Sequence, residues 1–183
     1  MSKRIFPALM ATFLSACATQ PPPHVEAAAR PLEVLPGDAN ITTARQDLLA
    51  TARDRFGAAA VDRALASPTH LIAKRFAGMS PPPPPGADPN WRPPAPAVLM
   101  VREGSTWFVA TGSGWRPANA SAAAQIEALL ADAKLWREPA FTPACPDYGA
   151  QLLLLRAAGR PETVRNSQCT SRASQIVEAA LAA

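Results

Sequence analysis

The sequence predicts an α+β fold, in which a small antiparallel sheet of two hairpins is covered by packed helices. Two pairs of short apolar segments, each pair separated by a turn that contains glycine, predict the hairpins. Two later segments with apolar residues at helical spacing predict the helices that cover the sheet. A short helical segment and proline-rich linkers are expected to precede this part of the chain.

The first residues have the three-part layout of a secretory signal peptide. Lys3 and Arg4 form a basic start. An apolar stretch of about ten residues follows, too short for the roughly 20 residues that span a bilayer as a helix. Small residues then lead to Cys17. We therefore expect residues 1–16 to be removed on export.

Leu14-Ser15-Ala16-Cys17 resembles the lipobox of bacterial lipoproteins. The resemblance implies that the Cys17 thiol receives a diacylglyceryl group, that a peptidase cuts just before it, and that the new amine is acylated. Two or three acyl chains anchor a protein stably, whereas one gives reversible binding. Ala18 stands where an aspartate retains enteric lipoproteins in the inner membrane. The resemblance thus implies the outer membrane rather than the inner, with the globular part in the periplasm.

Proline dominates two segments of the mature chain. In residues 17–40, prolines and small residues follow the lipidated cysteine, a composition that predicts a flexible tether. Residues 81–96 hold nine prolines, five of them consecutive, which adopt the stiff polyproline II conformation. We interpret this segment as a loop or linker, with a ligand for a proline-binding groove as the alternative.

Residues 41–80 are expected to form the helical segment. Apolar side chains recur at helical spacing up to Phe56, where Gly57 interrupts the pattern. A second short helix is expected over residues 58–66. Residues 69–76 alternate loosely between apolar and polar, which fits a strand and, nearly as well, a helix.

The α+β domain is expected over residues 97–183, and its first hairpin gives the clearest signal. A two-residue turn at Glu103 and Gly104 would pair residues 98–101 with residues 106–109. Both faces of this hairpin would then be apolar, so we expect it to be covered on both sides.

The remaining elements of the domain follow in the same order. An amphipathic helix is predicted over residues 120–136, before a proline. A second hairpin is expected to join residues 151–156 to residues 162–166. A last helix is predicted over residues 172–181, with Ser171 as its N-cap.

Cys145 and Cys169 remain once Cys17 is lipidated, and an even pair of cysteines in an exported chain favours a disulfide. The two cysteines fall near opposite positions at the open end of the second hairpin. The bond would close a loop of about 24 residues and contribute roughly 3 kcal/mol. No histidine flanks either cysteine, which disfavours a catalytic thiol.

The chain is poor in residues for catalysis and metal binding. It has two histidines, His24 and His70, so no metal site is predicted, and we expect no cofactor. It also lacks the dense basic run of a nucleic-acid binder, despite a net charge of +4. We therefore expect a non-catalytic binding or structural module with an envelope protein or cell-wall partner. The alternative is a small lipoprotein hydrolase that uses Ser113 or His70.

Polar-tipped aromatic residues provide a candidate contact patch, because such residues are enriched at recognition surfaces. Trp91, Trp115 and Tyr148 are expected in loops, and Arg116 follows Trp115 directly. These four residues could form one patch. The competing interpretation is that their side chains fold over the edge of the domain.

Overall fold

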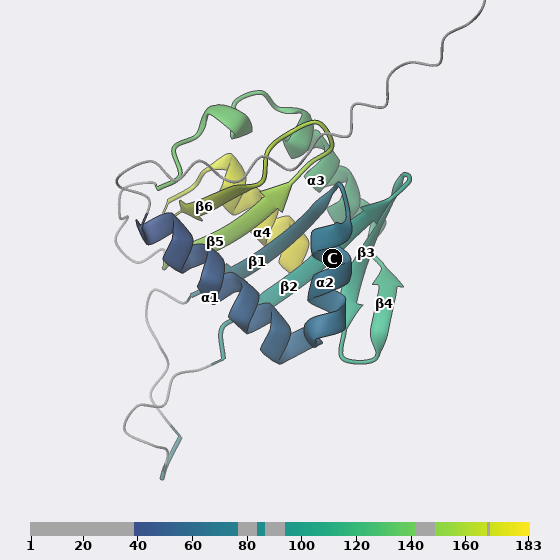
Figure 1. The fold of residues 1–183 in the computed structure, drawn as a ribbon. Helices are drawn as coiled ribbons and strands as arrows, with labels where there is room; N and C mark the ends of the chain where they lie inside the picture. Colours follow the sequence, from purple (N-terminus) through teal and green to yellow (C-terminus); the bar gives the residue numbers. More distant parts are fainter. Residues whose placement is uncertain (1–38, 77–83, 87–93, 142–148, 168) are drawn as a thin grey trace, which may run out of the picture. The chain divides into compact units, whose positions relative to one another are not determined.

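Six antiparallel strands form one sheet, in the order β4-β3-β2-β1-β5-β6 (Figure 1). The strands are β1 His70–Arg75, β2 Ala97–Glu103, β3 Thr106–Thr111, β4 Gly114–Pro117, β5 Gln151–Arg156 and β6 Thr163–Ser167. Both predicted hairpins are present, as β2-β3 and β5-β6. The predicted α+β fold class, with an antiparallel sheet and packed helices, is therefore confirmed.

The structure is a computed structural model, and it describes residues 39–76, 84–86, 94–141, 149–167 and 169–183. All of these described residues belong to one compact unit. Several predictions concern residues outside the described ranges. These residues are the signal peptide, Cys17, most of the tether, Trp91, Cys145, Tyr148 and much of the proline-rich segment.

Helices cover both faces of the sheet (Figure 1). They are α1 Ala39–Phe56, α2 Ala58–Ala66, α3 Ala120–Ala131, the 3-10 helix η1 Leu135–Arg137 and α4 Arg172–Leu181. α1 and α2 pack on one face, where Ile72 and Leu99 are buried. α3, η1 and α4 pack on the other face, where Leu71 and Met100 are buried. The expectation that the first hairpin is covered on both sides is confirmed.

Strand β1 lies between the two hairpins. Ile72 is opposite Leu99 of β2 on one side and Leu154 of β5 on the other. Residues 69–76, which fitted a strand or a helix, thus contain the strand that joins the hairpins into one sheet. The segment 41–80, expected to be helical, contributes two helices and this strand.

The first hairpin turns one residue later than predicted. Met100 pairs with Val109 and Val101 with Phe108, so Gly104 and Ser105 form the two-residue turn. Gly104 has a φ of 60°, a left-handed conformation that costs glycine little. The correction shifts the pairing by two residues, which leaves each side chain on its predicted face of the sheet.

The helix predicted over residues 120–136 is also shorter than expected. α3 ends at Ala131, and Asp132 adopts an extended conformation. The Asp132 side chain accepts a hydrogen bond from the backbone N–H of Lys134 at 2.8 Å. Such local bonds compete with helical ones, so the chain leaves the helix before η1. The predicted cap of α4 is confirmed, since Ser171 Oγ accepts a 2.9 Å hydrogen bond from the Ser174 N–H.

Cys169 lies between β6 and α4 and is disulfide-bonded. Its predicted partner, Cys145, and the third cysteine, Cys17, lie outside the described residues, so the pairing stays a prediction. Within the described ranges, no helix combines the length and the apolar character that crossing a membrane requires.

The disulfide predicts a specific loss of stability. Cys145→Ser should lower the melting temperature by several degrees, because it removes a crosslink that restricts the unfolded chain. Reduction of the wild type should lower it by a similar amount, whereas Cys17→Ser should leave it unchanged. Calorimetry with and without reductant measures all three. A Cys145→Ser protein as stable as the oxidised wild type would show that Cys169 has another partner.

Candidate functional site

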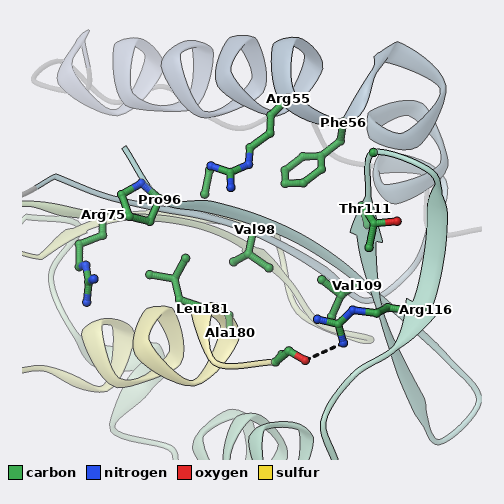
Figure 2. Close-up of a pocket in the computed structure, with 14 residues that line it drawn as sticks. Arg55, Phe56, Arg75, Pro96, Val98, Val109, Thr111, Arg116, Ala180 and Leu181 are labelled. Carbon is green, nitrogen blue, oxygen red and sulfur yellow. Dashed lines mark hydrogen bonds between the residues drawn. The ribbon is translucent and has the colours of Figure 1, made fainter. Parts of the chain in front are cut away.

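A pocket of about 460 Å³ opens at one end of the sheet. Strands β1 and β3 end there, β2 begins there, and the last residues of α1 and α4 lie on either side (Figure 2). Its size lies within the range of about 300–1,000 Å³ that is common for ligand pockets. Residues from both faces of the sheet thus meet around one opening.

Three arginines line this pocket: Arg55 from α1, Arg75 from β1 and Arg116 from β4. Figure 2 shows Arg55 extending from α1 toward the sheet, with Arg116 reaching in from the β4 side. The described lining residues include no aspartate or glutamate. Because the charged side chains of this lining are all cationic, the pocket favours anionic groups.

Arg116 and Arg55 are oriented by main-chain oxygens. Arg116 Nη1 donates to the backbone oxygen of Ala183 at 2.8 Å, a contact drawn as a dashed line in Figure 2. Arg55 Nη1 donates a longer hydrogen bond, 3.4 Å, to the backbone oxygen of Ala95. The Ala95 carbonyl oxygen accepts this hydrogen bond without neutralising the Arg55 guanidinium, so Arg55 can still pair with a ligand anion.

Arg75 has a different partner. Its Nη1 lies 2.8 Å from Glu178 Oε2 of α4, in an ion pair whose side chains are 43% and 49% exposed. Glu178 does not line the pocket, but its carboxylate partly offsets the charge of Arg75.

The floor of the pocket is apolar. Val98 of β2, Val109 of β3 and Leu181 of α4 lie between the arginines (Figure 2). The pocket therefore combines cationic donors at its rim with a surface on which the apolar part of a ligand can rest.

Trp115 and Arg116, the two described members of the predicted contact patch, do not share one surface. The segment after the first hairpin forms the edge strand β4, where Trp115 is opposite Ala110 and Arg116 is opposite Val109. Successive side chains of a strand point to opposite faces. Trp115 packs on the α2 side, with the Arg63 guanidinium 4.7 Å from its ring centroid, whereas Arg116 lies in the pocket.

Trp91 and Tyr148, the other two members of that patch, lie outside the described residues. Sequence reasoning identified Arg116 but missed Arg55 and Arg75. Neither arginine belongs to a motif. Strand pairing places Arg75 at this end of the sheet, and the packing of α1 places Arg55 there.

The two residues of the hydrolase alternative lie at opposite ends of the sheet. Ser113 is in the exposed turn between β3 and β4, and its Oγ lies 3.3 Å from Thr111 Oγ1. His70 begins β1 opposite Val101, near the start of β3, and its side chain is fully buried. The structure therefore does not bring Ser113 and His70 together.

His70 lies instead in a partly buried cluster with Glu162 and Arg45. Its Nδ1 lies 3.0 Å from the backbone oxygen of Ser67, and its Nε2 lies 3.5 Å from Glu162 Oε2. Arg45 Nε of α1 donates to Glu162 Oε1 at 2.8 Å. Burial raises the pKa of Glu162, but the nearby His70 ring and the hydrogen bond from Arg45 outweigh this and hold the pKa below its ordinary value. The cluster ties α1 to the sheet.

Comparisons with protein-family models, with curated proteins and with solved structures find no match to this chain. Its function therefore has to be inferred from the arginine pocket and the charges around it. In the described ranges, no group of three or more potential metal ligands gathers.

The charge cluster predicts how stability depends on pH. Glu162→Gln should destabilise the protein by about 2 kcal/mol near neutral pH, because it removes charge-assisted hydrogen bonds. The folded pKa of Glu162 lies below the ordinary value of 4.5. This stabilisation is therefore complete above that value and is lost as the pH falls through the folded pKa. Urea unfolding at neutral and acidic pH measures the difference between the two proteins.

The matched control is Glu103→Gln, which removes an exposed pair with Arg63 and should cost less than about 1 kcal/mol. The difference between wild type and Glu162→Gln should narrow in acid. A difference that stays constant with pH would show that the ionisation of Glu162 does not stabilise the fold.

Proposed function

We propose that this protein is a lipid-anchored envelope lipoprotein whose globular part binds an anionic ligand in the arginine pocket without transforming it. One observation carries the proposal. Arg55, Arg75 and Arg116, from three distant parts of the chain, line one pocket whose described lining holds no acidic residue. Guanidinium groups present planar pairs of donors that match the oxygens of a carboxylate or a phosphate.

The other side chains of the pocket support binding rather than catalysis. General acid–base work usually requires histidine, a carboxylate, lysine, tyrosine or cysteine near the reacting group. None of these is among the described lining residues, where Thr111 supplies the one hydroxyl. Arginine stays protonated at any physiological pH and so acts as a donor.

The predicted lipid anchor determines where the protein would encounter such a ligand. The tether between Cys17 and α1 would reach at most about 75 Å when fully extended. A pocket held within this distance of a membrane would meet ligands of the cell envelope, either a protein partner or a component of the cell wall. The anchor and the pocket can be tested separately.

The anchor predicts a covalently attached fatty acid. Wild-type protein grown with a labelled fatty acid should take up the label and stay in the membrane fraction. Cys17→Ser should lose the label and be released or misprocessed, because the thiol that carries the lipid is gone. Gel analysis of the fractions measures both. Wild-type protein that stays in the membrane fraction without label would contradict the lipoprotein assignment.

The pocket predicts binding of a carboxylate. Acetyl-dialanine, which has a carboxylate and no ammonium, should bind to the full-length chain, and its neutral amide should not. Arg55→Gln or Arg116→Gln should weaken binding about tenfold, the effect of losing about 1.4 kcal/mol from one charge-assisted contact. Titration followed by nuclear magnetic resonance measures these affinities.

Arg53→Gln is the matched control, since Arg53 is exposed on α1 and does not line the pocket. It should bind acetyl-dialanine like the wild type. Equal weakening in all three arginine variants would point to non-specific attraction by net charge. Binding that is unchanged in Arg55→Gln and Arg116→Gln would contradict the proposed site.

A further inference from the structure

A second groove, of about 710 Å³, lies on the other side of α4. It is lined by residues of α3, α4 and the start of β5. Glu178 is the one charged residue among its described lining residues, and most of the others are glutamine, serine, threonine or alanine. The last turns of α4 contribute to the walls of both hollows. The arginine pocket and this groove are therefore neighbours of opposite charge.

One ion pair connects the two hollows. Arg75 lines the arginine pocket and Glu178 lines the groove, and Arg75 Nη1 lies 2.8 Å and 3.2 Å from the two oxygens of Glu178. Both side chains are about half exposed, and ion pairs in such positions contribute little to stability. A ligand that offers each partner a new counter-charge can therefore replace this pair at little cost.

Gln151 fixes the carboxylate and provides a further acceptor. It is the cross-strand neighbour of Arg75, and its Nε2 donates to Glu178 Oε1 at 2.7 Å. This contact fixes the orientation of the amide, because the reverse orientation would set two acceptors against each other. Gln151 Oε1 is then buried with no hydrogen-bond partner among the described residues, an arrangement that is rare in folded proteins. A carboxylate and an unpaired amide oxygen side by side favour a cationic donor.

We propose that the ligand is zwitterionic, with a carboxylate that binds Arg75 and its neighbours in the pocket and an ammonium that binds Glu178 in the groove. This inference rests on the proposed anion-binding function and names the class of its ligand. The carboxylate takes the place of Glu178 on Arg75. The ammonium takes the place of Arg75 on Glu178, and its three N–H donors can also serve Gln151 Oε1.

A zwitterion is expected to bind more tightly than a simple anion, because it leaves no charge in the site without a partner. An anion that pairs with Arg75 must compete with Glu178 and leaves that carboxylate without its cation. A zwitterion satisfies both side chains at once. A short peptide with unblocked ends has the required form, since the termini of extended dialanine lie about 7 Å apart and can lie on either side of the Arg75–Glu178 pair.

Dialanine and two derivatives that each lack one of its charges test the inference on the purified full-length chain. Dialanine carries both charges, acetyl-dialanine lacks the ammonium, and dialanine amide lacks the carboxylate. Dialanine should bind about tenfold more tightly than either of the others. In Glu178→Gln this advantage over acetyl-dialanine should disappear, while acetyl-dialanine should bind at least as tightly as to the wild type, because its competitor for Arg75 has lost its charge.

Glu103→Gln is the control, because it removes an ion pair of similar exposure that lines neither hollow. It should keep the full preference for dialanine. Equal affinity of the wild type for dialanine and acetyl-dialanine, or a preference that survives in Glu178→Gln, would overturn the zwitterion while anion binding stands. Failure of acetyl-dialanine to bind at all would overturn the proposed function itself, and the inference with it.

Discussion

The fold depends on hydrogen bonds along both edges of β1. A hairpin alone is marginally stable in water, and the two hairpins of this chain become one sheet because β1 pairs with β2 on one side and with β5 on the other. The side chains of β1 alternate between two cores, with Leu71 facing α4 and Ile72 facing α1. The same pairing sets Arg75, the last residue of β1 and part of the pocket lining, beside Gln151 of the second groove.

Structural features that depend on residues close together in the sequence could be predicted. The short helix expected over residues 58–66 matches α2, because Gly57 and Pro68 mark its limits. α4 begins directly after Ser171, its predicted cap, which is another local signal. The turn of the first hairpin was not predictable, since turns at Gly104 with Glu103 or with Ser105 leave the apolar side chains on the same faces. The turn conformation itself selects between them.

The pocket could not be predicted, because its arginines lie far apart in the sequence and become neighbours through strand pairing and helix packing. Conversely, residues that are adjacent in the sequence do not always share a surface. Trp115 and Arg116 are adjacent, yet the alternation of β4 sends one toward Arg63 and the other toward Ala183. The sequence offered no sign of β4 because a four-residue edge strand with glycine and proline at its ends resembles a loop.

The way the pocket is assembled connects binding to folding. Its lining joins the end of α1 to the end of α4, the first and last helices of the described fold, so the site exists when the whole sheet is formed. A ligand that binds the native state alone stabilises it by about 2.7 kcal/mol at one hundred times its dissociation constant. For a chain whose core is built largely from alanine and short aliphatic side chains, an occupant of the pocket would act as a reversible crosslink. The supply of ligand would then set what fraction of the protein stays folded.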